Sequence, residues 1–366
     1  MTDRPEDRVL RITSADLHTE RVEEWLRREE AIRAVPEEVA AEPPGRFAFL
    51  LDSVVYTTIA GFLGGFLGWA LIEPIFDDGE ESALQVVAAV LFFPVIGMMV
   101  GGAVASMEGI VTRNWRRAFS QGLTALAISF GLCLAGGFLA GIVYGIGQFA
   151  VESVFTLDPE APDLQGPSFF GQMVVRGFAW AVAGLCVGVS QGLAAKSKKV
   201  AANGLVGGLA GGLLGGLLFD PVDRLVQGDA WNSPEREAGA EFSRCVGITV
   251  VGLFVGFFLG LVENLAKDAW LYMKAGPLRG KQFILYHDPT VIGSSPKCHV
   301  YLFKDPAVEP RHATIVGYGN RHQLKDLGGQ AGVRVNGRDV TSHVLAPGDR
   351  IQIGETVLEY GQRIRS

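Results

Sequence analysis

Charged residues are missing from six long stretches of this chain, and their absence bounds the fold class. A helix needs about 20 apolar residues to cross the hydrocarbon core of a bilayer, and a soluble helix of that length normally carries a polar face. The sequence therefore predicts a polytopic α-helical membrane bundle and not a soluble helical core. The six stretches are Val54–Ile72, Leu84–Met107, Ala118–Val151, Gly177–Ala195, Val200–Phe219 and Cys245–Val262.

Signatures of catalysis and of cofactor binding are also missing. The chain has no P-loop, GxSxG, HExxH or kinase motif, so we expect no enzyme, no catalytic residue and no cofactor. Its four cysteines show neither a CxxC pair nor metal-ligand spacing, which predicts no disulfide framework and no metal site. A net charge of −7 argues against nucleic acid as a partner. The opening MTDRPEDRVL lacks an apolar core, so we expect the first membrane helix, not a cleaved signal peptide, to direct insertion.

Composition divides the 366 residues into three parts. Residues 1–45 are charged and form an N-terminal segment, with a short amphipathic helix expected around Leu17–Ile32 and a Pro-rich linker at Pro36–Gly45. Residues 46–266 contain the six apolar stretches, and residues 267–366 show short alternating segments. We expect a cytoplasmic segment, a transmembrane domain and a cytoplasmic β-domain.

The loop charges predict the orientation. Basic residues gather between helices two and three, at Arg113–Arg117, and between helices four and five, at Lys196–Lys199. Acidic residues gather in the loops around Asp77–Glu81 and Asp158–Asp163. Because cytoplasmic loops concentrate lysine and arginine, both termini are expected in the cytoplasm, and the protein is expected in the cell (plasma or inner) membrane.

The membrane part shows internal similarity. Helices two, four and six end in VGGAVASMEG, AGLCVGVSQG and VGFFLGLVEN, which aligns Glu108, Gln191 and Glu263. The pattern predicts an up–down helical hairpin repeated three times.

Small residues recur at every fourth position in five of these helices. Such a glycine zipper lies on one stripe of a helix and lets two backbones approach closely. Packing is favoured over a pore lining for these rows. The rows are Gly97–Gly101–Ala105–Gly109, Gly137–Gly141–Gly145, Gly184–Gly188–Gly192, Gly204–Gly208–Gly212–Gly216 and Gly252–Gly256–Gly260.

Charges near the helix ends argue against a coupled transporter. Arg176 and Arg244 begin helices on the outer side, where Glu73 and Asp220 end theirs, and we expect structural pairs among them. No charge lies at a helix centre, where proton relays and ion ligands are found. A channel stays open as an alternative if helix packing leaves a continuous polar path. The polar residues available for one are Asn203, Ser129, Thr124, Ser190, Gln191 and Gln148.

The last hundred residues read as a small β-sandwich. Alternating segments KQFIL, HVYL, HATIV, HQLKDL, VRV, IQI and TVLEY lie between turn signals such as Asn336–Gly337. Four pieces, VIGSSPKCHVYL, DPAVEPRHATI, KDLGGQAGVRVNG and LAPGDRIQIGETVLEY, resemble the forkhead-associated (FHA) domain over about 95 residues, Trp270–Ile364. The resemblance implies a β-sandwich whose loops bind phosphothreonine peptides of partner proteins. It does not extend to the six-helix part.

The resemblance implies a set of peptide-binding loop residues, but this chain departs from the family at the phosphate ligands. Gly293 matches, whereas the phosphate-contacting arginine corresponds to Ser294, the phosphate-holding serine to Glu309, and a loop asparagine to Ala331. His312 matches a histidine that buttresses the loops. Asn336 and Gly337 match a family pair in which the asparagine contacts peptide backbone and the glycine shapes a turn. The candidate site is Ser294, Ser295, Glu309, Arg311, His312, Asn336 and Gly337, with Arg311, Lys297 or Lys304 available to replace part of the lost charge. The other histidines, His18, His287, His299, His322 and His343, are interpreted as ordinary surface or strand residues.

These observations favour a membrane-anchored scaffold that presents an FHA-like domain to a cytoplasmic protein or peptide, with weak or lost phosphothreonine binding. Two alternatives stay open: a channel or transporter regulated by the domain, and a phosphothreonine-dependent recruitment platform for signalling. The bilayer is the other expected partner, and the sequence leaves the oligomeric state open.

Overall fold

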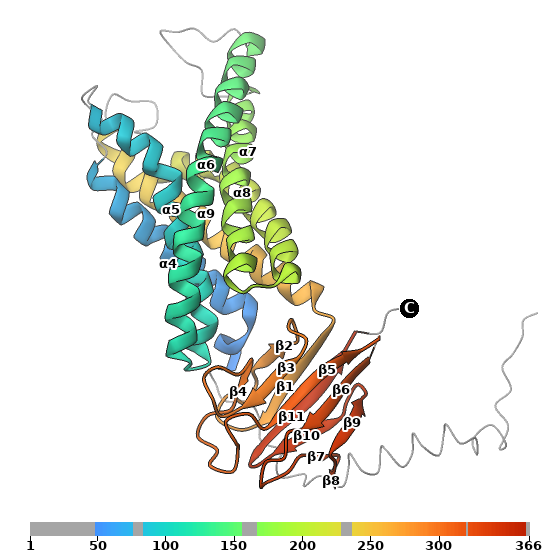
Figure 1. The fold of residues 1–366 in the computed structure, drawn as a ribbon. Coiled ribbons are helices and arrows are strands. Elements are labelled where there is room, and N and C mark those ends of the chain that lie inside the picture. Colours follow the sequence, from blue (N-terminus) through green and yellow to red (C-terminus); the bar gives the residue numbers. More distant parts are fainter. Residues whose placement is uncertain (1–47, 76–82, 156–166, 228–235, 320, 364–366) are drawn as a thin grey trace, which may run out of the picture.

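The computed structural model describes residues 48–75, 83–155, 167–227, 236–319 and 321–363, which form six long helices and then a β-sandwich (Figure 1). The predicted N-terminal segment 1–45 and the acidic loops at 77–81 and 158–163 lie outside the described residues. The helices are α4 (Ser53–Ile72), α5 (Ala83–Val111), α6 (Trp115–Phe155), α7 (Pro167–Ala194), α8 (Lys198–Gln227) and α9 (Arg236–Ala266), with short 3₁₀ turns η1 (Ala48–Leu51) and η2 (Glu73–Ile75) flanking α4.

All six helices are long and apolar enough to cross a membrane, judged by length and composition. Each packs against its neighbours in the chain, and α9 packs against α4, so the helices close into a ring. Helices α5, α7 and α9 also contact one another. Val100, Val187 and Val255, one from each of these three helices, lie in one buried apolar cluster. The three hairpin repeats stay a prediction.

Glycines lie where helix backbones come closest. A Cβ atom added to Gly208 of α8 would stand 2.8 Å from the carbonyl carbon of Gly184 of α7, and one added to Gly256 of α9 would stand 3.0 Å from Cα of Gly61 of α4. Only glycine allows such approaches. The row on α6 differs from the expectation, because an added Cβ at Gly141 or Gly145 would meet nothing within 4 Å. A spacing of four therefore marks a packed stripe on α5, α7, α8 and α9, whereas on α6 only Gly137 has a neighbouring helix within 4 Å of an added Cβ.

The charges at the far end of the bundle form pairs, as predicted. Arg244 Nε lies 3.0 Å from Glu73 Oε1, and Arg176 Nε lies 3.1 Å from Asp220 Oδ1. Both carboxylates are buried, where an unpaired charge would be costly. We interpret these pairs as structural links between neighbouring helices.

The β-domain is a sandwich of two sheets. One sheet has the order β2-β1-β11-β10-β7-β8 and the other β4-β3-β5-β6-β9, with β3 and β4 parallel. Alternate residues of the strands meet between the sheets, among them Leu271, Ile292, Ile315, Ile351 and Leu358. The seven predicted segments coincide with strands, while β1, β3, β8 and β9 were not among them. The strands are β1 (Ala269–Ala275), β2 (Gln282–Ile284), β3 (Thr290–Gly293), β4 (Val300–Tyr301), β5 (Ala313–Tyr318), β6 (Arg321–Asp326), β7 (Arg334–Val335), β8 (Arg338–Asp339), β9 (Ser342–Leu345), β10 (Arg350–Ile353) and β11 (Thr356–Gln362).

The sandwich sits against the end of the bundle that carries the basic loops (Figure 1). Only Lys267 and Asp268 separate α9 from β1. Lys199 Nζ lies 3.1 Å from Asp268 Oδ2, and Asn114 Nδ2 donates to the Pro296 carbonyl at 2.8 Å. So short a connection keeps the β-domain within reach of both basic loops, and these contacts attach it to them.

Candidate functional site

Three loops of the sandwich bring most of the candidate residues together: β3–β4 (294–299), β4–β5 (302–312) and β6–β7 (327–333). The Ser294 amide donates to the Glu309 carbonyl at 2.9 Å, and the Ser295 amide donates to the Pro310 carbonyl at 3.2 Å. Gly293 permits this pairing, because a Cβ there would stand 2.5 Å from the Pro310 oxygen. The first two loops are thus joined through their backbones.

His312 joins the second loop to the third. Its side chain is fully buried, and Nδ1 accepts the Glu309 amide at 3.1 Å. Nε2 therefore carries the proton and donates to the Gly332 carbonyl, 3.0 Å away. Gly329 lets the third loop lie on this ring, since a Cβ there would stand 2.6 Å from His312 Cε1 and 3.0 Å from Glu309 Cγ. The imidazole holds the loop framework from within.

The surface of this loop cluster carries charges of both signs. Ser294 and Glu309 are partly exposed, and Arg311 is exposed. A phosphate needs charge-assisted donors, and a guanidinium fork is the usual one. Ser294 supplies a hydroxyl only, and Glu309 supplies a negative charge. The β4–β5 loop offers two exposed cations, Arg311 and Lys304, and the β3–β4 loop offers Lys297.

Asn336 and Gly337 lie outside these three loops. Both have positive φ, 52° and 79°, in the turn between β7 and β8. The Asn336 amide donates to Asp349 Oδ1 at 2.8 Å, and its oxygen accepts the Arg350 amide at 2.9 Å. Its side chain is buried. The asparagine thus stabilises a turn of the sandwich, and the peptide contact implied by the resemblance stays a prediction.

The β3–β4 loop is also attached to the helical bundle. Asn114, in the turn between α5 and α6, is 2% exposed and donates to Pro296, while its Oδ1 accepts the Arg117 amide at the start of α6 at 3.1 Å. Arg117 Nη1 lies 3.3 Å from the His299 carbonyl, and Nη2 lies 3.0 Å from Glu108 Oε2. The loop that carries Ser294 and Ser295 is therefore anchored to the helical bundle.

Two histidines that the sequence left as ordinary lie in this contact. The His287 and His299 rings stack with centroids 4.3 Å apart. Burial, the His287 ring and Arg117 lower the pKa of His299 to about 4. Its neutral Nδ1 accepts the Val291 amide at 3.0 Å. No sequence signal marked these residues, because their role depends on contact with a distant part of the chain.

Lys281 makes a second contact between the sandwich and the helical bundle, and the sequence did not predict it. It precedes β2, is 2% exposed, and donates to the Leu51 carbonyl and the Tyr56 hydroxyl, both at 3.3 Å. Its ammonium also lies 4.3 Å from the centre of the Tyr56 ring. Burial lowers the pKa of Lys281, and Glu108 and Glu263 oppose that shift. The β-domain thus places a cation at the base of α4.

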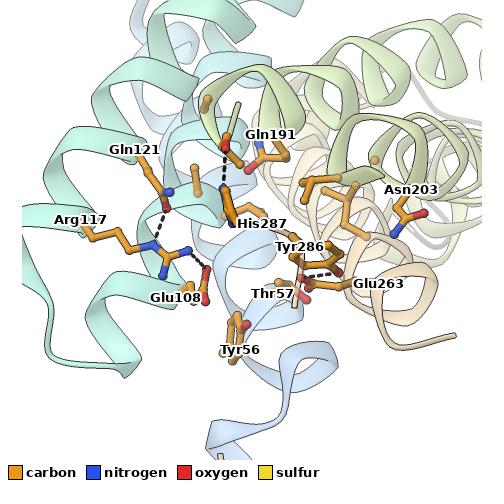
Figure 2. A pocket seen from close by; sticks show the side chains of 17 residues that line it. Tyr56, Thr57, Glu108, Arg117, Gln121, Gln191, Asn203, Glu263, Tyr286 and His287 are labelled. Atoms are coloured by element: carbon orange, nitrogen blue, oxygen red, sulfur yellow. Dashed lines mark hydrogen bonds and ion pairs between the residues drawn. The ribbon is translucent and has the colours of Figure 1, made fainter. Parts of the chain in front are cut away.

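A chamber of about 110 Å³ lies between the bundle and the sandwich. All six helices contribute to its wall, and Tyr286 and His287 cover it from the β-domain (Figure 2). Gln191 and Asn203 line it, but Ser129 is bonded to Ser190 within the helix packing. Val104 and Leu259 close the chamber toward the apolar cluster of the bundle. Of the six polar residues considered for a channel, Gln191 is also bonded to Ser190, whereas the hydrogen bonds of Thr124 and Gln148 go to residues of their own helix.

Residues 273–362 match the family described as "Inner membrane component of T3SS, cytoplasmic domain". The match lies within the sandwich. The chain is 37% identical over 95 residues to the oxoglutarate dehydrogenase inhibitor of Corynebacterium jeikeium, which covers 26% of this chain and 65% of the relative. It is 39% identical over 95 residues to the glycogen accumulation regulator GarA of Mycolicibacterium smegmatis, covering 26% and 60%. The chain thus spans about three fifths of the length of these relatives.

Solved structures similar to the sandwich include FHA domains. One, from a structural and functional analysis of phosphothreonine-dependent FHA domain interactions, is 26% identical and covers 27% of this chain and 100% of that chain, with a TM-score of 0.25. The FhaA FHA domain complexed with the intracellular domain of Rv3910 is 28% identical and covers 25% and 99%, with a TM-score of 0.24. The C-terminal region resembles FHA domains over the residues that the family model and the relatives match.

Proposed function

We propose that this chain is a membrane-anchored, non-enzymatic scaffold that binds a cytoplasmic protein or peptide through the loops of its FHA-like domain. The attachment of the sandwich to the bundle carries the proposal. With two residues between α9 and β1, and with Asn114 and Arg117 holding the β3–β4 loop, the domain is a fixed platform and not a tethered module. A fixed platform presents its loops in one orientation relative to the membrane.

The proposed location is the cell (plasma or inner) membrane, with both termini in the cytoplasm. The matching family is described as an inner membrane component with a cytoplasmic domain, which supports this placement for the sandwich. The basic loops Arg113–Arg117 and Lys196–Lys199 lie at the same end of the bundle as the sandwich, as the positive-inside rule requires for a cytoplasmic face.

The partner peptide is proposed to bind with little dependence on phosphorylation. Two unit charges about 4 Å apart repel by about 1–4 kcal/mol near a protein surface, and a phosphate carries nearly two charges. Glu309 would impose this repulsion, and Ser294 provides no cation to offset it. Recruitment that depends on phosphothreonine is the alternative, and it would require Arg311, Lys297 or Lys304 to supply the positive charge.

Paired peptide libraries test the proposal. The full chain in detergent would be titrated by calorimetry with threonine peptides and the same peptides phosphorylated. We expect the best ligands of the two libraries to have dissociation constants within about tenfold of each other, a difference of about 1.4 kcal/mol. A preference of about a hundredfold or more for the phosphorylated peptides would support the recruitment alternative instead.

The attachment itself can be tested with Asn114→Asp. Aspartate caps a helix as well as asparagine does, so it keeps the bond to the Arg117 amide, but it cannot donate to Pro296. The loss of such a bond is worth about 1 kcal/mol. We expect amide hydrogen exchange in the 294–299 loop to become about tenfold faster, with α6 unchanged.

The matched control is Asn264→Asp, the same chemical change at a residue that bonds Lys267 and not the β3–β4 loop. Equal protection of the loop in both variants would mean that the sandwich alone orders it.

A further inference from the structure

Exposed cations gather where the turn between α5 and α6 meets the β3–β4 loop of the sandwich. Asn114 of the turn donates to the Pro296 carbonyl of the loop at 2.8 Å, so Arg113 and Lys297 each lie one residue from this bond. Arg116 lies in the first turn of α6. Arg113, Arg116 and Lys297 are exposed, and none of them forms an ion pair with another described residue.

A second contact brings a further cation from the β4–β5 loop. Cys298 Sγ donates to the Pro310 carbonyl at 3.1 Å, and the next residue, Arg311, is exposed. Burial raises the pKa of the Cys298 thiol, and the positive charge of Arg311 opposes that shift, so the guanidinium lies near this contact. Two direct contacts thus connect the cations of the turn, the β3–β4 loop and the β4–β5 loop.

The charges that flank these contacts do not cancel. Glu108 of α5 is paired with Arg117 at 3.0 Å. In the β4–β5 loop, buried Asp305 adjoins exposed Lys304. Glu309 is partly exposed and is the acidic residue among those that flank the Cys–Pro contact. Four exposed cations therefore face one carboxylate, and the surface has a net positive charge.

Placing the bundle in a membrane puts this turn at the depth of the lipid headgroups. α5 ends at Val111 and α6 begins at Trp115, and both helices are long and apolar enough to cross a bilayer. Three residues between them reach at most about 10 Å, and the headgroup layer is about 5–8 Å deep on each side. Trp115 and Phe119 are 59% and 67% exposed, and a tryptophan beside arginines is typical of the membrane–water interface. The bond from Asn114 holds the β3–β4 loop beside this layer.

We propose that the contact between the α5–α6 turn and the β3–β4 loop binds the phosphate of an anionic phospholipid, with Arg113, Arg116 and Lys297 as its cations. The exposed aromatic rings of Trp115 and Phe119 favour a lipid over a peptide, because they offer an apolar surface to acyl chains beside the cations. One headgroup bridges the bundle and the sandwich, since two cations belong to the first and one to the second. The inference rests on the membrane placement in the proposed function and not on its peptide binding.

Amide hydrogen exchange of the full chain in lipid nanodiscs tests the proposal. The two preparations are discs of phosphatidylcholine alone and discs of an equimolar mixture of phosphatidylcholine and phosphatidylglycerol. The 195–197 turn between α7 and α8 reports the general effect of a charged surface on exchange. Relative to that turn, we expect the 294–299 loop to exchange about fivefold to tenfold more slowly in the mixed discs, because each cation near an anionic surface contributes about fivefold.

Variants that lose one cation link the effect to this contact. Lys297→Gln and Arg116→Gln should each remove most of the protection that phosphatidylglycerol gives. Both should match the natural chain in discs of phosphatidylcholine alone, which would show that the loop itself is not loosened. The matched control is Lys198→Gln, which removes an exposed lysine from the other basic loop and should keep the full protection.

Equal exchange of the loop in the two kinds of disc would overturn the proposal. So would an equal loss of protection in Lys198→Gln, because the attraction would then be spread over the whole basic face. If inorganic phosphate or a phosphothreonine peptide protects the loop in discs of phosphatidylcholine and phosphatidylglycerol does not, the cations bind that ligand and not a lipid. Cell fractionation checks the membrane placement separately, so a chain found in membranes with equal exchange in both discs would contradict the lipid site alone.

Discussion

Gly208→Leu is expected to lower the melting temperature of the chain in detergent by about 10 °C, corresponding to about 3 kcal/mol or more. An added Cβ at Gly208 would meet the backbone of Gly184 and, at 3.2 Å, the Cα of Gly188. Backbone atoms of a packed helix cannot rotate away as a side chain does, so α7 and α8 would have to separate. Separation would also open the contacts of both helices with their other neighbours in the ring.

Gly141→Leu is the matched control for this change. It makes the same substitution in a row with the same spacing, but an added Cβ at Gly141 meets nothing within 4 Å. We expect its melting temperature to stay within about 2 °C of the natural chain, since substitutions away from packed features are usually worth less than about 0.5 kcal/mol. Similar small effects at both positions would contradict the close approach of α7 and α8.

Ser294→Arg combined with Glu309→Ser is expected to strengthen binding of phosphothreonine peptides by about tenfold to a hundredfold, which is about 1.4–2.8 kcal/mol. The change removes a repelling carboxylate and adds a guanidinium, the group that best matches phosphate oxygens. Both positions belong to one place, because the Ser294 amide is bonded to the Glu309 carbonyl. The fold should tolerate the pair, since Gly293 and the buried His312 hold the loops independently of either side chain.

The measurement is calorimetry with a phosphothreonine peptide and its unphosphorylated form. Binding of the unphosphorylated form should change little. Gln323→Arg with Glu359→Ser changes the net charge of the sandwich by the same amount, but on strands β6 and β11 instead of the loops. If that control gains as much affinity, the effect is long-range attraction, and the loop cluster is not where the phosphate binds.

The predictions from the sequence that the structure confirms depend on local properties of the chain. An apolar run such as Cys245–Val262 specifies a helix by its length and composition, and the observed α9 contains it. Alternation in segments such as IQI specifies a strand with one face inward, and Ile351 and Ile353 are fully buried. The glycine row on α6 shows the limit of such patterns. Its spacing is the same as that on α8, yet no helix lies against Gly141. The spacing shows that the glycines share one face of the helix, but it does not show what packs against that face.

The candidate site likewise has residues that the sequence identified and contacts that only the structure shows. The loop residues Ser294, Glu309 and His312 could be identified from the sequence, because each follows a matching segment at a fixed distance. Asn336 could be identified from the sequence too. The sequence did not show that its side-chain amide is hydrogen-bonded to Asp349 and to the backbone amide of Arg350. The contact between Asn114 and Pro296 joins residues 182 positions apart, and neither segment contains a pattern that predicts the contact.

By itself, the sequence determined six membrane-length helices and, after them, a β-sandwich that resembles FHA domains, because hydropathy and periodicity are properties of short segments. The tertiary structure decided which glycine stripes are packed, that the β3–β4 loop is held by the bundle, and that Glu263 faces a chamber covered by Tyr286 and His287. These depend on which surfaces meet when the ring closes and the sandwich docks, and the free energy of such contacts belongs to pairs of distant segments rather than to either one.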